Sequence, residues 1–201
     1  MSITIINLFK YYGKIEILKG INYRFEDHKK YIIKGENGIG KTTLLKAILN
    51  QIKYLGVIEV EGRISYVPEG VILPNYMSIY SFVETISNLT SRVDDFDNLF
   101  NKYYKDLGLE VNKKSMLGSL SKGQKQKVNI IQALLSPSEI LLLDEPLSGL
   151  DPESKKNFVS IIKKDPRMVI IISHQTANFR KKDFNFLEIN KGELNVLSKA
   201  D

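Results

Sequence analysis

The sequence predicts an α/β protein with a mainly parallel sheet, an antiparallel β region at the N-terminus and a helical insertion near residues 70–136. Two continuous apolar runs, Ile140–Leu143 and Met168–Ile172, flank a helical pattern at Pro152–Lys164. This order of strand, helix and strand, with runs that are apolar at every position, is typical of a buried parallel sheet. From Leu73 to about Leu135, apolar residues instead recur at helical spacing.

Branched apolar residues between turn residues predict five strands in the first 70 residues. They are Ile3–Leu8, Ile15–Phe25, Tyr31–Lys34, Val57–Val60 and Arg63–Val67. A helix from Lys41 to about Ile52 is expected after the third strand. The last two strands are expected to form a hairpin around Glu61 and Gly62.

The remaining elements complete one domain of residues 1–201. The last helix of the insertion is expected to start after Ser121, and a short strand pair is expected around Lys191 and Gly192. Approximately residues 1–69 and 137–201 are expected to form the core with its β subdomain. Approximately residues 70–136 are expected to form a helical subdomain.

Composition excludes several kinds of site. The chain has no cysteine and only two histidines, His28 and His174, which excludes disulfides, thiol nucleophiles and Cys- or His-rich metal sites. With 29 basic and 23 acidic residues the net charge is +6, but the lysines are scattered in pairs. This spacing is typical of a solvated surface, so no nucleic-acid partner is expected.

No stretch is long enough to cross a membrane. The longest apolar run has five residues, Met168–Ile172, whereas a bilayer needs about 18. The N-terminus also lacks the pattern of a secretory signal. We therefore expect a cytoplasmic protein, which leaves docking on a membrane protein open.

A phosphate-binding loop follows the strand at Tyr31–Lys34. The stretch from Gly35 to Thr43 fits the pattern G-x-x-x-x-G-K-[ST] and lies between a predicted strand and a predicted helix. The nine residues are Gly35, Glu36, Asn37, Gly38, Ile39, Gly40, Lys41, Thr42 and Thr43. Lys41 would reach the β- and γ-phosphates, and the Thr42 hydroxyl would take a Mg²⁺ position. The pattern predicts a P-loop NTPase core that binds a nucleoside triphosphate.

Two carboxylates, Asp144 and Glu145, follow the apolar strand Ile140–Leu143. Ligands of open α/β sheets bind at the carboxyl ends of the strands. Asp144 is therefore expected to hold Mg²⁺, and Glu145 to accept a proton from the attacking water. A strand that merely ends in charged residues is the alternative, which the phosphate loop makes less favoured.

Together with four further segments, these motifs resemble the ATP-binding cassette (ABC) ATPases. The further segments occur in the order of that family: the aromatic segment Leu8–Gly13, the signature-like Leu120–Gln124, the D-loop-like Ser148–Asp151, and Ser173-His174. The likeness extends over essentially the whole chain. It implies ATP and Mg²⁺ as ligands and ATP hydrolysis as the activity.

The resemblance assigns roles to residues that their positions alone leave open. It implies that Ser121, Lys122, Gly123 and Gln124 contact ATP held by an opposite subunit, and that Asp151 belongs to the D-loop. It also implies that Tyr12 stacks on adenine and that His174 contacts the γ-phosphate and orients the water. From the residues alone, Ser121 is equally a helix N-cap, Tyr12 a packing residue and His174 an ordinary strand-end histidine.

Two positions depart from the family pattern. Lys122 replaces the first glycine of the signature, and Glu69 stands where most relatives have the glutamine of the Q-loop. A carboxylate there resembles the branch that serves exporters with a separate membrane subunit. Glu69 is expected to approach Mg²⁺; a surface glutamate on a loop is the alternative.

The resemblance implies a stand-alone ATPase subunit of a transporter. It would pair head-to-tail with a second ATPase subunit, as a homo- or heterodimer around two ATP·Mg²⁺, and drive an integral membrane permease that holds it peripherally at the inner face of the cell membrane. The alternative is a non-transport ABC ATPase acting on nucleic acid or ribosomes. The long insertions or second domain typical of such proteins are absent from these 201 residues.

Overall fold

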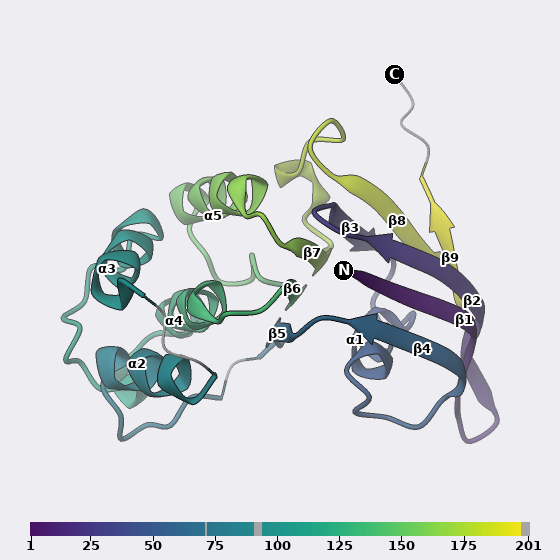
Figure 1. Cartoon of the computed structure of the whole chain (residues 1–201), viewed down its shortest axis with the longest axis horizontal. Coiled ribbons are helices and arrows are strands. Elements are labelled where there is room, and N and C mark those ends of the chain that lie inside the picture. The colour runs from purple at the N-terminus through teal and green to yellow at the C-terminus, as the bar shows by residue number, and fades with distance from the viewer. Residues whose placement is uncertain (71, 91–93, 198–201) are drawn as a thin grey trace.

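The computed structural model describes residues 1–70, 72–90 and 94–197 (Figure 1). Residues 71, 91–93 and 198–201, which fall within the expected domain and subdomain limits, lie outside the described residues. In the described part, helices α2, α3 and α4 lie together at one end of the molecule. An antiparallel sheet with helix α1 lies at the other end. The α/β class with a mainly parallel sheet is confirmed.

The antiparallel sheet has the strand order β2-β1-β4. Its strands are β1 (Ser2–Tyr12), β2 (Ile15–Glu26) and β4 (Leu55–Glu61). Ser2 pairs with Glu26 on one side and with Glu61 on the other, so β1 is the central strand.

The larger sheet has six strands in the order β5-β6-β7-β3-β8-β9. They are β3 (Lys30–Lys34), β5 (Ile64–Val67), β6 (Ile140–Asp144), β7 (Met168–Ile172), β8 (Asn185–Asn190) and β9 (Glu193–Val196). All neighbouring pairs are parallel except β8 and β9, which form the expected strand pair around Lys191 and Gly192. Because β3, β6 and β7 are parallel, their carboxyl ends meet at one edge.

The hairpin expected around Glu61 and Gly62 is wrong. β4 pairs with β1 in the antiparallel sheet, whereas β5 pairs in parallel with β6 in the larger sheet. The chain thus crosses from one sheet to the other at Gly62, which adopts φ 124°. Gly62 marks a connection between sheets because each strand finds its partner elsewhere in the chain.

Five α-helices occur in the described residues. They are α1 (Lys41–Ile48), α2 (Ile79–Thr90), α3 (Phe96–Asp106), α4 (Lys122–Leu135) and α5 (Pro152–Lys164), with 3₁₀ turns at Leu117–Ser119 and Thr176–Asn178. Helix α1 ends four residues earlier than expected, because Asn50 takes a left-handed conformation with φ 54°. Helix α4 begins directly after Ser121, as expected.

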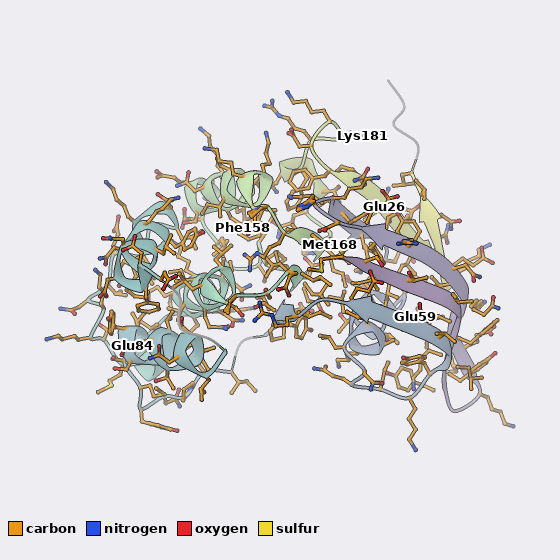
Figure 2. The ribbon with its side chains drawn as sticks, in the orientation of Figure 1. Glu26, Glu59, Glu84, Phe158, Met168 and Lys181 are labelled. Carbon is orange, nitrogen blue, oxygen red and sulfur yellow. The ribbon has the colours of Figure 1, made fainter. Side chains whose placement is uncertain are left out.

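The larger sheet separates two apolar cores. Successive strand residues point to opposite faces, so Leu141 and Leu143 pack with α2–α5, whereas Ile140 and Leu142 pack with α1 and the antiparallel sheet. Phe158 of α5 and Met168 of β7 are fully buried on the two sides, and Lys181 projects from the surface (Figure 2). Burial on both faces explains the unbroken apolar runs.

No helix in residues 1–70, 72–90 and 94–197 is long and apolar enough to cross a membrane.

Candidate functional site

The loop between β3 and α1 curls around the Lys41 ammonium. Lys41 Nζ donates to the carbonyl oxygens of Gly35 at 2.9 Å and Glu36 at 2.8 Å, and the residue is only 8% exposed. Gly40, with φ 117°, leads into α1, and no side chain caps that helix. The first amides of α1 and the third ammonium donor therefore suit an anion at the mouth of the loop.

A cavity of about 400 Å³, the phosphate cavity, opens beside this loop. Its lining comes from the loop and α1, from the turn after β5, and from the carboxyl ends of β6 and β7: Asn37, Gly38, Gly40, Lys41, Thr42, Thr43, Glu69, Asp144, Glu145, Ile172 and His174. Of the nine loop residues predicted to bind ATP, Gly35, Glu36 and Ile39 do not line the cavity. Ile39 packs against the second apolar core instead.

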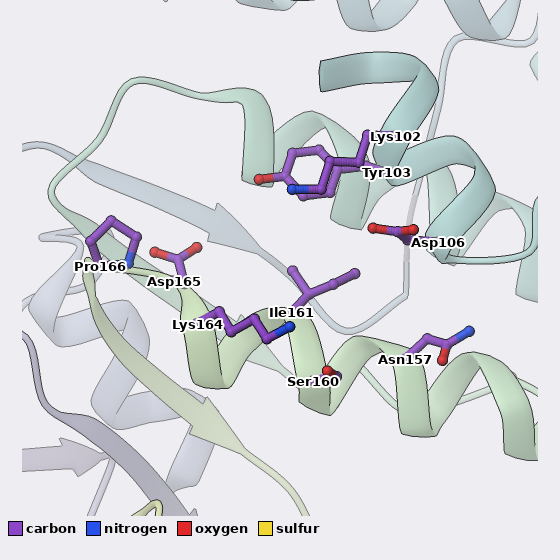
Figure 3. Close-up of a pocket in the computed structure, with 9 residues that line it drawn as sticks. All are labelled: Lys102, Tyr103, Asp106, Asn157, Ser160, Ile161, Lys164, Asp165 and Pro166. Atoms are coloured by element: carbon purple, nitrogen blue, oxygen red, sulfur yellow. The ribbon is translucent and has the colours of Figure 1, made fainter. Parts of the chain in front are cut away.

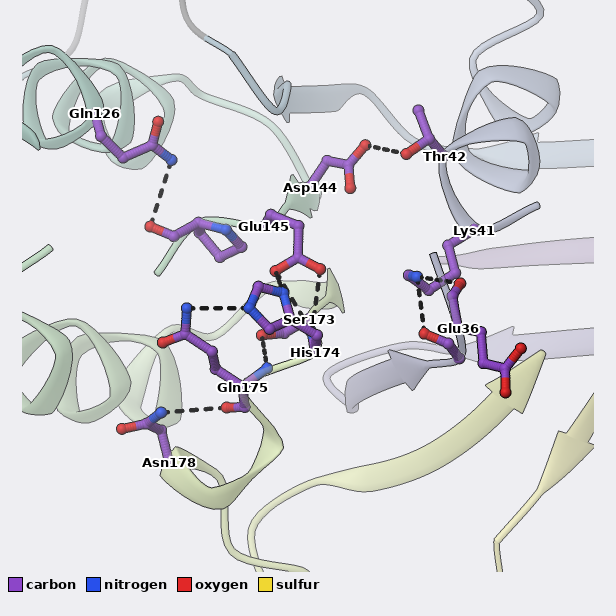
Figure 4. A network of polar contacts seen from close by, with 12 residues as sticks. Glu36, Lys41, Thr42, Gln126, Asp144, Glu145, Ser173, His174, Gln175 and Asn178 are labelled. Atoms are coloured by element: carbon purple, nitrogen blue, oxygen red, sulfur yellow. Dashed lines mark hydrogen bonds and ion pairs between the residues drawn. The ribbon is translucent and has the colours of Figure 1, made fainter. Parts of the chain in front are cut away.

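Thr42 and Asp144, 102 residues apart, meet at the floor of this cavity. The Thr42 hydroxyl donates to Asp144 Oδ2 at 2.7 Å (Figure 4). The other oxygen, Asp144 Oδ1, is buried and has no hydrogen-bond partner among the described residues. Burial raises the pKa of Asp144, and the Thr42 bond opposes that rise. The nearby charges of Glu69 and Glu145 raise this pKa further.

These groups fit Mg²⁺. The ion prefers oxygen ligands, and a buried carboxylate oxygen without a donor is stabilised by a cation. Within the described part of the chain, no group of three or more acidic or histidine side chains is arranged to hold a metal by itself. Thr42 and Asp144 would therefore hold the ion together with phosphate oxygens and water, as is usual for Mg²⁺ bound with a nucleotide.

Glu145 and His174 form a second pair. His174 Nδ1 lies 2.8 Å from Glu145 Oε2, and the His174 amide donates to Oε1 at 3.1 Å (Figure 4). Glu145 is 6% exposed and takes a left-handed backbone with φ 48°, a conformation that costs about 1–3 kcal/mol in a non-glycine residue. Two contacts to His174 thus fix a carboxylate at the cavity wall.

The signature-like residues lie at the start of α4. Ser121 and Gln124 form a capping box: the Ser121 hydroxyl accepts from the Gln124 amide at 3.3 Å, and the Ser121 amide donates to Gln124 Oε1 at 2.9 Å. Ser121, Lys122, Gly123 and Gln124 do not line the phosphate cavity of their own chain. Lys122 lines a neighbouring groove of about 510 Å³, whose wall includes Glu69 and Glu145.

Asp151 caps α5. Its carboxylate accepts from the Ser154 amide at 2.8 Å and from Lys127 Nζ at 3.0 Å. The Lys127 contact was not predicted from the sequence. Lys127 lies four residues before Ile131 and seven before Leu134, so a charge on the apolar stripe of α4 is the signal that could have identified it.

Tyr12 lies outside the cavity beside the loop of residues 35–43. It ends β1, is 49% exposed and does not line the cavity; Lys10 Nζ lies 4.6 Å from its ring centroid. Another hollow, of about 380 Å³, lies between α3 and α5 and contains none of the predicted site residues (Figure 3).

A glycine-rich loop before a helix, a threonine bonded to a strand-end aspartate and an adjacent glutamate define an α/β protein of the class that binds nucleoside triphosphates. The family model described as "ABC transporter" matches residues 18–148. The chain belongs to the ABC transporter family and is one of its ATP-binding subunits; this family hydrolyses ATP.

Individual relatives agree with this assignment. The energy-coupling factor transporter ATP-binding protein of Thermotoga maritima is 30% identical over 96% of this chain and 80% of its own length. The spermidine/putrescine import ATP-binding protein of Fusobacterium nucleatum is 32% identical over 79% of this chain and 46% of its own length. A solved ATP-binding subunit of an ABC transporter has the same fold, with a TM-score of 0.87 at 20% identity, covering 98% of this chain and 90% of that chain.

Proposed function

We propose that the chain hydrolyses ATP·Mg²⁺ in a head-to-tail pair with a second ATPase subunit, identical or different, and drives a separate integral membrane permease. The Thr42–Asp144 bond beside the free Asp144 Oδ1 is the observation that carries this proposal. It gives the floor of a cavity next to the phosphate loop the ligands that a nucleotide-bound Mg²⁺ requires. Peripheral attachment at the inner face of the cell membrane follows from the permease.

The proposed roles follow from the positions in the cavity. Lys41 and the first amides of α1 bind the β- and γ-phosphates, and Glu145, held by His174, accepts the proton of the water that attacks the γ-phosphorus. When bound, Mg²⁺ neutralises phosphate charge during this transfer. Tyr12 is proposed to stack on adenine, and Glu69 to approach the ion from the Q-loop position.

Pairing is supported by the separation of the two motifs. Because Ser121 and Gly123 do not line the cavity of their own chain, a γ-phosphate in that cavity needs these residues from a second subunit. We assign Lys122, Gln124 and the D-loop residue Asp151 to the same interface. The helical subdomain, residues of about 70–136, is proposed to carry the signature residues within the single domain 1–201.

A membrane partner is supported by exposed apolar side chains beside α2. Ile72, Tyr76 and Met116 are 97%, 82% and 54% exposed, and Met116 is tied to this region by a bridge to Ser78. Apolar side chains gathered on a surface mark contact sites. The exporter direction rests on Glu69 alone, and the Fusobacterium nucleatum relative is named for import.

The test is phosphate release by the purified chain, with and without EDTA, alone and reconstituted with its permease in proteoliposomes. We expect Mg²⁺-dependent hydrolysis that the permease stimulates, and transport that depends on the chain. Stimulation by nucleic acid or ribosomes instead would support the non-transport alternative. Substrate loaded inside or outside the vesicles gives the direction of transport.

A further inference from the structure

Lys127 is a cation buried where three helices meet. Its side chain is 10% exposed and lies on α4, three residues after Gln124, the last of the signature residues. Nζ donates to Asp151 Oδ2 at 3.0 Å and to the Gly108 carbonyl oxygen, just after α3, at 2.9 Å. The Lys127 ammonium therefore joins α4 to the N-cap of α5 and to the end of α3.

Ser154 closes the same cluster. Its hydroxyl lies 2.6 Å from Asp151 Oδ2 and 3.1 Å from the Leu107 carbonyl oxygen, so one proton serves both acceptors. Bonds from Ser154, and then from Lys127, hold the pKa of Asp151 well below its ordinary range. Asp151 is thus an anion fixed from two sides.

A second tie lies at the other end of the D-loop. A Cβ atom at Gly123 would stand 2.3 Å from the Gly149 carbonyl oxygen, so the two backbones are in direct contact. Gly149, with φ 75°, and Asp151 flank Leu150. The D-loop (residues 148–151) is therefore held against α4 at both ends, by backbone contact and by the Lys127 ion pair.

The two members of the ion pair differ in burial. Lys127 is 10% exposed, whereas Asp151 is 52% exposed. An apolar side chain of similar length at position 127 would leave a carboxylate that water and Ser154 still stabilise, so we expect a smaller loss of stability than for a fully buried pair. The main effect of the ion pair is to fix the position of the D-loop relative to α4 and the end of α3.

We propose that Lys127 is a positioning residue that fixes the D-loop to the start of α4 and to the end of α3. The D-loop and the signature residues then reach the second subunit as one unit. This rests on the proposed pairing of subunits. Lys127 does not line the phosphate cavity of its own chain. Its loss therefore changes turnover by the pair and leaves ATP binding by the single subunit unchanged.

The test compares Lys127→Met and Lys127→Arg with Lys105→Met, which makes the same change at an exposed lysine of α3. Hydrogen–deuterium exchange of residues 147–151 reports D-loop position without requiring activity. Exchange is expected to be faster in Lys127→Met only. We expect kcat of Lys127→Met to fall about 10- to 100-fold, since misplacement by about 1 Å has effects of this order. Affinity for ATP without Mg²⁺ and the melting temperature should stay close to those of the wild type.

Lys127→Arg should restore most of the turnover, because guanidinium offers the same charge and more donors. Ser154→Ala, which loosens Asp151 by another route, should reduce kcat in the same direction. Unchanged exchange and kcat in Lys127→Met beside an active wild type would overturn this role alone. Equal losses of turnover, ATP affinity and melting temperature would also overturn it, because they indicate a structural role. An inactive wild type would contradict the proposed function as well.

Discussion

The backbone of Gly123 lies so close to Gly149 that any side chain at position 123 would collide with the Gly149 carbonyl oxygen. The obstacle is backbone, so relief requires movement of the D-loop or of the start of α4. A signature glycine thus has a structural reason within its own subunit, separate from any contact with a phosphate.

Gly123→Ala is expected to displace these segments. We expect the free energy of unfolding to fall by about 1–3 kcal/mol, which is typical of overpacking. We also expect a large loss of ATPase activity. ATP binding to the isolated subunit should persist, because Gly123 is outside the phosphate cavity. Urea unfolding, phosphate release and calorimetric titration measure the three quantities. Wild-type turnover in this variant would show that the collision is relieved without consequence.

Lys41→Ala should abolish hydrolysis and weaken ATP binding strongly. The ammonium organises the loop through the Gly35 and Glu36 carbonyl oxygens and faces the proposed phosphate site. Losing the phosphate-facing cation removes most transition-state charge stabilisation. Phosphate release and nucleotide titration are the measurements, with circular dichroism to show that the variant is folded. Normal turnover would contradict the assignment of the loop.

Glu145→Gln should bind ATP without cleaving it. The amide keeps the shape of the side chain but loses the proton acceptor. Because ATP is proposed to lie between two subunits, the closed pair should accumulate by mass action. Size-exclusion chromatography with ATP·Mg²⁺ detects it. A variant that binds ATP yet stays monomeric, even with every partner subunit supplied, would count against a composite site.

Glu69 is predicted to set the Mg²⁺ dependence. It lines both the phosphate cavity and the groove beside the signature, and its charge raises the pKa of Asp144. Glu69→Gln removes a charge that attracts the metal and repels the γ-phosphate, with Coulomb effects on the order of 1 kcal/mol or more. We expect a weaker apparent Mg²⁺ requirement with hydrolysis largely intact.

Glu69→Ala should mainly uncouple ATP hydrolysis from stimulation by the permease. A Mg²⁺ titration of the ATPase rate at fixed ATP, for the wild type and both variants, tests these expectations. If the three curves superimpose and the permease stimulates all three proteins equally, Glu69 has no role in the Mg²⁺ dependence or in coupling.

The ion pair between Asp165 and Arg167 should make stability depend on acid pH. Their side chains are 5% and 11% exposed, and Arg167 also donates to the Ala133 and Ser136 carbonyl oxygens at the end of α4. Burial by itself raises the pKa of Asp165, but the Arg167 bonds outweigh it and the net pKa is lowered. The pair therefore stabilises the fold above the unfolded pKa of about 4, and this contribution is lost as the pH falls through the lower folded value.

Asp165→Asn should consequently cost about 3–5 kcal/mol near pH 7, because it leaves a buried guanidinium without its charge partner. The difference from the wild type should shrink as the pH falls below about 4, where the carboxylate of the unfolded wild type begins to protonate, and should level off below the lower folded pKa. Urea unfolding from pH 3 to pH 7 gives both curves. A difference that stays constant over this range would contradict the linkage.

Those parts of the fold that depend on local patterns could be predicted from the amino-acid order alone. The unbroken apolar runs predicted the parallel sheet, and the G-x-x-x-x-G-K-[ST] pattern correctly predicted a loop between a strand and a helix, which are β3 and α1. The two carboxylates after Ile140–Leu143 were placed at the correct edge, because parallel strands align their carboxyl ends. Ser121 was correctly taken as the residue before α4, because capping depends on only a few neighbouring residues.

Contacts between distant segments could not be predicted in this way, because they depend on how the whole chain packs. Two short strands around Gly62 have the same pattern whether they pair with each other or with strands in two sheets, so their separation was not predictable. The hydrogen bond from Thr42 to Asp144, the contact of Gly123 with Gly149 and the buried Lys127 ion pair likewise join residues that are far apart in the chain. Hydrophobic periodicity specifies which face of an element is buried, but the partner on that face is chosen by packing of the whole core.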